Sequence, residues 1–155
     1  MLRRVARIVA LVILVGFIGT QFVPVHRTNP PVNSAQTVEH LAAVPPDVKA
    51  IFDRSCRDCH SNETRWPAYG YVAPMSWMLV RDVEEGREHL NLSEWGGYDT
   101  DSQRDVLVEI CRQVRRGNMP LKRYTLIHSS AKLKATDVET LCNWTNTMRR
   151  SLPPE

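Results

Sequence analysis

The chain has 155 residues, a length that suits one globular domain with a short additional segment. Its formal net charge is +3 at pH 7, and part of that charge lies close to the N-terminus. No basic stripe with interleaved aromatic residues is present, so the sequence argues against a nucleic-acid-binding protein. Four tryptophans are many for a small domain, and such flat side chains suit the wall of a flat cofactor as well as an ordinary core.

The N-terminal segment, residues 1–26, places positive charge ahead of an apolar run. Arg3, Arg4 and Arg7 precede a mostly apolar stretch from residue 8 to about residue 25, and ~20 such residues are enough to cross a bilayer. Positive charge on the leading side predicts a cytoplasmic N-terminus, with the rest of the chain beyond the membrane. A cleaved signal peptide is the alternative. We therefore expect a single-pass protein of the bacterial inner membrane whose main domain lies in the periplasm, where disulfides persist.

A linker is predicted at residues 27–45, where several prolines stiffen the chain. The main domain is predicted at residues 46–152. Its first helix is expected to begin at Pro46, since proline is tolerated in the first helical turn, and to lead into Cys56. One face of this helix is apolar and carries Val48, Ile51 and Phe52.

The run Cys56-Arg57-Asp58-Cys59-His60 is the attachment motif of c-type haem. Two thiols at this spacing lie on one face of a helical turn, so that each can bond one haem vinyl group. The histidine that follows can then bind the iron as the proximal ligand. The motif therefore predicts covalently bound haem c, held by Cys56, Cys59 and His60.

Three other interpretations of this motif compete with haem attachment. A thioredoxin-like redox pair needs a strand before the motif and a βαβ context, whereas a helix is expected here. A zinc site needs two more ligands, but Cys111 and Cys142 are single and far apart in the sequence. A disulfide between Cys56 and Cys59 would strain so short a loop.

The remaining elements alternate between helices and loops. An ordered loop at residues 61–74 carries Trp66 and Tyr69, and a helix at 73–90 carries Trp77. The next helix is expected from Thr100 to about residue 116, where Gly117 ends it. The last helix is expected from Thr136 until Pro153. Because no segment alternates as a strand does, we predict an all-α, cytochrome c-like domain around a covalently bound haem, preceded by one transmembrane helix.

Met119 is the candidate for the sixth iron ligand. It follows Gly117 outside a helix and precedes Pro120, which fixes the local backbone. Ligation by one histidine and one methionine raises the reduction potential of haem relative to two histidines. His128 and His89 are the alternative ligands, and Met119 as an ordinary core residue is a further alternative.

Two further groups of residues complete the predicted site. The haem carboxylates need cationic or donor partners, and the candidates near the motif are Arg65, Arg81, Arg87, Trp66 and Tyr69. Cys111 and Cys142 lie on the inward stripes of two helices, which predicts a disulfide; two reduced, buried cysteines are the alternative.

Several sequence motifs continue beyond the haem attachment run. Trp66-Pro67, Ser76-Trp77, Gly86-Arg87 and Asn91-x-Ser93-x-Trp95 are followed by Gly117-x-Met119-Pro120-Leu121, Tyr124 and Ala131-x-Leu133. As a set they resemble the bacterial haem-binding domain family of small, membrane-anchored, cytochrome c-like proteins. The resemblance implies covalent haem at Cys56 and Cys59, His60 as proximal ligand and Met119 as distal candidate. The chain departs from the family pattern at Ala68, in place of a second tryptophan, and at Ser129-Ser130 after His128.

Electron transfer is the predicted function, because a six-coordinate haem iron has no open position for a substrate. We expect an electron carrier or haem-binding module rather than an enzyme, since no paired carboxylates or base accompany the motif. A five-coordinate or ligand-displaceable haem sensor, or a peroxidase-like protein, is the alternative, and an accessory module of a larger membrane complex is a third. We expect redox partner proteins, which the sequence does not identify. We expect contact with the membrane through the N-terminal helix and no binding of nucleic acid.

Overall fold

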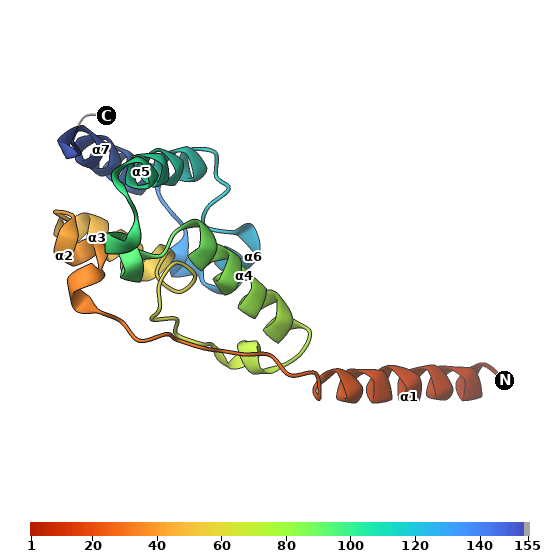
Figure 1. Cartoon of the computed structure of the whole chain (residues 1–155). Helices are drawn as coiled ribbons and strands as arrows, with labels where there is room; N and C mark the ends of the chain where they lie inside the picture. Colours follow the sequence, from red (N-terminus) through yellow and green to blue (C-terminus); the bar gives the residue numbers. More distant parts are fainter. Residues whose placement is uncertain (154–155) are drawn as a thin grey trace. The chain divides into compact units, whose positions relative to one another are not determined.

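The computed structural model describes residues 1–153, and within them the chain forms helices and loops without a β-strand (Figure 1). The prediction of an all-α chain is therefore confirmed. The described residues divide into two compact units, 1–28 with 66–82 and 29–65 with 83–153. Each unit is described by itself.

The first unit contains α1 (Leu2–Thr20), η2 (Ala68–Tyr71) and the beginning of α4 (Met75–His89). Gln21, just after α1, exchanges two hydrogen bonds with the backbone of Ala73, at 3.0 and 3.3 Å. The Arg27 guanidinium lies 4.4 Å from the centre of the Tyr71 ring and donates to the carbonyl oxygen of Gly70. The chain that follows α1 is thus fastened to the loop that precedes α4.

The prediction of a membrane anchor is wrong. Among residues 1–153, no helix is both long and apolar enough to span a bilayer. The physical reason lies in the bounds of α1, which includes Arg3, Arg4 and Arg7 and ends at Thr20, so its charge-free part falls short of the ~20 residues that a span requires. This finding overturns the expected single-pass, inner-membrane location with a periplasmic haem domain.

The second unit begins with η1 (Ser34–Gln36), α2 (Val38–Leu41) and α3 (Pro46–Ser55). It continues after α4 with η3 (Leu92–Gly97), α5 (Thr100–Arg115), α6 (Lys122–Ile127), η4 (Ser129–Ala131) and α7 (Ala135–Ser151). The predicted helix start at Pro46 is confirmed, as is the end of α5 before Gly117, whose φ of 67° is the left-handed conformation that glycine favours. The short helix α6 was not expected.

The core of the second unit lies between α3, α5 and α7. The rings of Phe52 and Trp144 meet edge to face, with centroids 5.4 Å apart, and the Trp144 indole donates to the carbonyl oxygen of Ala43. Leu107 of α5 and Leu141 of α7 are among the fully buried side chains. Burial of these large apolar groups is the main contribution to the stability of the unit.

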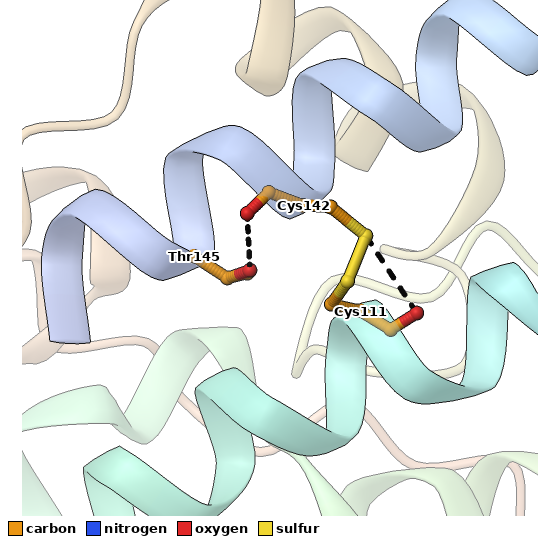
Figure 2. The surroundings of a disulfide bond; sticks show 3 residues. All are labelled: Cys111, Cys142 and Thr145. Carbon is orange, nitrogen blue, oxygen red and sulfur yellow. Dashed lines mark hydrogen bonds between the residues drawn. A yellow bond between two sulfur atoms is a disulfide. The ribbon is translucent and has the colours of Figure 1, made fainter.

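A disulfide between Cys111 and Cys142 joins α5 to α7, which lie side by side in Figure 1. Figure 2 shows the two sulfurs between the helices and the Thr145 hydroxyl donating to the carbonyl oxygen of Cys142. Cys142 is fully buried, whereas Cys111 is only partly buried. The predicted pairing of these two cysteines is thus the one that the structure contains.

Candidate functional site

The five residues 56–60 form a tight turn at the C-terminal end of α3. The backbone N–H groups of Cys59 and His60 both donate to the carbonyl oxygen of Cys56, at 3.2 and 2.9 Å. The turn follows directly from the helix, whose last residue is Ser55. The structure therefore presents the two cysteines and the histidine on one compact turn of chain, as haem attachment requires.

Neither Cys56 nor Cys59 takes part in a disulfide. Desolvation raises the pKa of the Cys56 thiol to about 12, and the neighbouring Cys59 adds to the effect. A redox-active cysteine of the thioredoxin kind has the opposite property, a lowered pKa that favours the nucleophilic thiolate. The electrostatic environment of Cys56 thus argues against a dithiol oxidoreductase.

The His60 ring is oriented by two backbone carbonyl groups at the end of α4. Its Nδ1 atom lies 2.8 Å from the oxygen of Gly86 and 3.1 Å from the oxygen of Leu90. Because a carbonyl oxygen can only accept, Nδ1 carries the hydrogen and Nε2 keeps its lone pair. Desolvation lowers the pKa of His60 in spite of these two bonds, and so favours the neutral ring. A neutral imidazole that donates from one nitrogen to a carbonyl is the usual state of a metal-binding histidine.

Gly86 allows α4 to approach the cysteine turn closely. A Cβ atom at this position would lie 2.7 Å from the carbonyl oxygen of Cys59 and 3.2 Å from its Cβ. Any side chain would therefore push α4 away from the turn and displace the carbonyl groups that hold His60. A glycine in the middle of a predicted helix indicates a close contact at that position. The sequence does not identify the contacting segment, which in the structure is the turn at Cys59.

Arg57, the first residue between the cysteines, is anchored by three carboxylates. It pairs with Glu39 of α2, with Asp53 one helical turn earlier and with Glu63 beyond the turn. Its side chain is 15 % exposed, so the ion pairs are only partly screened by water. Burial alone would lower the pKa of Arg57, but the attraction of Glu39 and Asp53 outweighs it and the pKa is raised.

Asp58, the second residue between the cysteines, is held from two directions. The Tyr124 hydroxyl of α6 donates to its Oδ2 atom at 2.8 Å, and the Arg65 guanidinium binds both carboxylate oxygens. Arg65 was expected to be a candidate for a haem carboxylate, and its bonds to Asp58 raise its pKa. Arg57 and Asp58, the two residues between the cysteines, thus attach the turn to α2 and α6.

The chain after His60 is joined to α4 and η3 by buried polar groups. The Asn91 amide donates to Asn62, and the Ser93 hydroxyl accepts from the Asn62 N–H. Leu92 N–H donates to the carbonyl oxygen of His60 at 2.8 Å. Buried polar groups that all find partners specify one conformation of the chain, so the segment behind the histidine is rigid.

Arg87 lies beside this segment and binds it. Its guanidinium donates to the carbonyl oxygen of Ser61, to the Thr64 hydroxyl and to the Asn29 side chain, at 2.8 to 3.0 Å. Burial lowers the pKa of Arg87. The predicted contact of Arg87 with a haem carboxylate remains a prediction, and what the structure adds is its role in fixing the chain after His60.

Met119 belongs to the same unit as His60 and follows the C-terminal turn of α5. It is partly buried and packs against the core cluster that also contacts Cys56. Of the two alternative ligands, His128 stacks on the Tyr124 ring with centroids 4.3 Å apart, and His89 is exposed at the end of α4. The choice between Met119 and these histidines remains a prediction.

The aromatic candidates Trp66, Tyr69 and Trp77 lie in the first unit, and all three are partly buried. The indole N–H of Trp77 is buried and has no hydrogen-bond partner among the residues that the structure describes. A buried donor without an acceptor costs free energy. Their contact with a cofactor remains a prediction.

Residues 1–153 contain no group of three or more His, Cys, Asp or Glu side chains that could hold a metal ion. The zinc interpretation of the cysteine motif needs such a group, so the described residues give it no support. The donor set of the turn, two thiols and one oriented imidazole, fits haem.

Comparison with known proteins gives one match. The sequence model of a haem-binding domain matches residues 15–147. Neither the curated proteins nor the solved structures contain a match.

Proposed function

Because this chain belongs to the haem-binding domain family and is thus a haem-binding protein, we propose that it carries haem c and transfers electrons. In this proposal Cys56 and Cys59 hold the haem through thioether bonds, and His60 is the proximal ligand of its iron. Met119 is the distal ligand. When bound, haem supplies one-electron redox chemistry that no side chain of the protein offers.

One observation carries the proposal: the Nδ1 atom of His60 donates to the carbonyl oxygens of Gly86 and Leu90, next to two cysteines. The two bonds fix the ring and leave Nε2 as its only electron-pair donor. The arrangement supports iron ligation through Nε2.

Rigid support of the turn is the second argument for electron transfer. Arg57 and Asp58 are each fixed by ion pairs or hydrogen bonds, and the chain after His60 is fixed by Asn62. An electron carrier benefits from a site that does not rearrange between its two oxidation states. A sensor or peroxidase-like protein needs an open or displaceable sixth position instead, and the partly buried Met119 favours the carrier.

The proposal is tested by producing the full chain together with a cytochrome c maturation system. We expect covalent haem, detected as a pyridine haemochrome that survives acid–acetone extraction, and a ferric spectrum with the weak long-wavelength band of a methionine–iron bond. Cys59→Ala should abolish most of the covalent haem. The double variant Cys111→Ala/Cys142→Ala removes two cysteines elsewhere and should keep it. Equal covalent haem in all three proteins would contradict the attachment, and a high-spin ferric spectrum with rapid cyanide binding would favour the sensor.

A further inference from the structure

Charge is distributed unevenly along the second unit. Residues 111–136 contain seven lysines and arginines and no carboxylate, whereas residues 83–110 contain eight carboxylates and two arginines. A net charge of +3 for the whole chain conceals this separation. The segment around Met119 is therefore strongly cationic, and its neighbour in sequence is anionic.

The cations of this segment form what we call the basic surface. It consists of Arg115, Arg116, Lys122, Arg123, Lys132 and Lys134, and all six are exposed. Among residues 1–153, no carboxylate forms an ion pair with Arg115, Arg116, Lys122 or Lys132, whereas Arg112 pairs with Glu109 and is left out. The charges of these four residues give this surface a positive potential.

Two large apolar side chains lie in the same stretch of chain as the basic surface, between Arg123 and Lys132. Leu126 and Ile127 of α6 are 80 % and 54 % exposed. Tyr124 of the same helix is partly buried instead: its hydroxyl donates to Asp58 and its ring stacks on His128. Helix α6 is thus held to the haem attachment turn on one side and leaves leucine and isoleucine in water on the other.

A hollow of about 470 Å³ lies over η4 and the chain that leads from η4 into α7. Its wall includes Lys132, Lys134 and the hydroxyl-bearing Ser129 and Ser130. The single carboxylate in the wall, Asp137, is paired with Arg54 at 2.5 Å. The hollow therefore offers cations and hydroxyl groups to an incoming carboxylate side chain.

From these observations we infer that the basic surface is the docking site of a partner protein with an acidic face. Leu126 and Ile127 are exposed, and cationic residues precede and follow them in the chain; exposed apolar side chains bordered by polar and charged groups are typical of a protein interface. Complementary charge accelerates the encounter of two proteins and selects the partner. That the partner is an electron-transfer protein rests on the proposed function, because Met119 lies between Arg116 and Lys122 in the chain.

Two other polyanions fit the surface less well. Single-stranded nucleic acid requires exposed aromatic rings for stacking, but the ring of Tyr124 is occupied by His128. A lipid surface requires a broad apolar helix face, whereas α6 has six residues and exposes only Leu126 and Ile127 as large hydrophobic side chains. Both remain outcomes of the experiment.

The experiment uses flavodoxin, a small acidic electron-transfer protein, as the probe. Its affinity for the full, haem-loaded chain is measured by titration calorimetry at low salt and at ~0.15 M salt, where charges are screened beyond ~8 Å. The electron-transfer rate from reduced flavodoxin is measured in parallel by stopped flow. The test variant is Lys122→Glu/Lys132→Glu, and the control is Arg149→Glu/Arg150→Glu, which makes the same change of net charge on exposed residues of α7.

We expect the test variant to bind flavodoxin at least about tenfold more weakly at low salt, and the control variant to lose less than about twofold. Equal losses in both variants, or no binding by the unmodified protein, would overturn the inference. Tighter binding to phosphatidylserine vesicles or to oligonucleotides than to flavodoxin would overturn it as well. A third outcome separates the two proposals. If the test variant alone weakens binding, the docking surface is supported. If reduced flavodoxin then fails to reduce the haem although dithionite reduces it, the proposed electron transfer is contradicted.

Discussion

The Nδ1 atom of His60 lies 2.8 Å from the carbonyl oxygen of Gly86, and the backbone of Gly86 in turn lies against Cys59. The same residue of α4 therefore orients the histidine and leaves room for the cysteine next to it. Gly86 thus connects α4 to the turn of residues 56–60 in two ways: its carbonyl group binds His60, and the absence of a side chain makes room for Cys59.

Replacing Gly86 by alanine should therefore damage the site although alanine favours helices. The added Cβ would lie 2.7 Å from the carbonyl oxygen of Cys59, a backbone atom that cannot rotate away. We expect a loss of ~1–3 kcal/mol in the free energy of unfolding, against an intrinsic gain of up to ~1 kcal/mol for alanine in a helix. Urea unfolding and the yield of covalent haem measure the effect. Gly97→Ala is the control, because its Cβ meets nothing within 4 Å, and equal stability of the two variants would contradict the close contact.

Met119→Ala tests the sixth ligand. Loss of a thioether ligand should lower the midpoint potential of the haem and open the iron to carbon monoxide. Met148→Ala serves as the matched control, because Met148 also packs against the core cluster but lies on α7. Potentiometry and carbon monoxide binding are the measurements. A potential that Met119→Ala leaves unchanged would assign the sixth position to His128 or His89.

Tyr124→Phe removes one hydroxyl group that connects α6 to the turn of residues 56–60. The hydroxyl donates to the carboxylate of Asp58, whose side chain is 16 % exposed, and a hydrogen bond to a charged acceptor contributes ~1.5–3 kcal/mol. We expect a loss of that size in the free energy of unfolding. The control is Tyr71→Phe, because Tyr71 is 59 % exposed. We expect the free energy of unfolding of this variant to be unchanged. An equally small effect in both variants would show that the bond to Asp58 contributes nothing.

The disulfide should contribute substantially to stability. Cys111 and Cys142 are separated by 31 residues, and closing a loop of that size removes unfolded-state entropy equivalent to ~3–4 kcal/mol. Cys111→Ala/Cys142→Ala should lose about that much free energy of unfolding, and dithiothreitol should have no further effect on it. An unfolding midpoint of the unmodified protein that dithiothreitol does not change would contradict a stabilising contribution of the disulfide.

Acid should weaken the start of α7. Burial would raise the pKa of Asp137, but the Lys134 N–H and the Arg54 guanidinium outweigh it and lower the pKa. A carboxyl whose pKa is lowered by folding contributes stability above about pH 4, and this contribution disappears as the pH falls through the folded-state pKa. Asp137→Asn removes a carboxylate from the first turn of α7 and should therefore lose roughly 0.5–1 kcal/mol at pH 7, and little below pH ~3. The exposed Asp105 supplies the control variant Asp105→Asn. An equal loss of stability at pH 7 in the two variants would contradict the role of the Asp137 charge.

The sequence predicts the regular helices well and the contacts between them poorly. The helices expected at 73–90, from Thr100 and from Thr136 are found as α4, α5 and α7, because apolar spacing and terminal glycine or proline signals are local. Helix α6 was missed, since its six residues carry no apolar periodicity and its place is fixed by the distant Asp58.

The site shows the same division between local and distant information. The motif of Cys56, Cys59 and His60 is visible in five residues, and the family match supports the haem that it predicts. The carbonyl groups that orient His60, at Gly86 and Leu90, carry no side-chain signal at all. The predicted membrane anchor failed because the arginines before the apolar run belong to the same helix as the run itself.

The bridge between Cys111 and Cys142 makes a covalent ring of the stretch that contains Met119 and α6. Cleavage of a single peptide bond in the exposed part of this ring, beside Lys122 for example, leaves the two pieces of the polypeptide attached to each other. The protein can therefore survive a nick at the surface proposed to meet its partner, and it comes apart there only under reducing conditions.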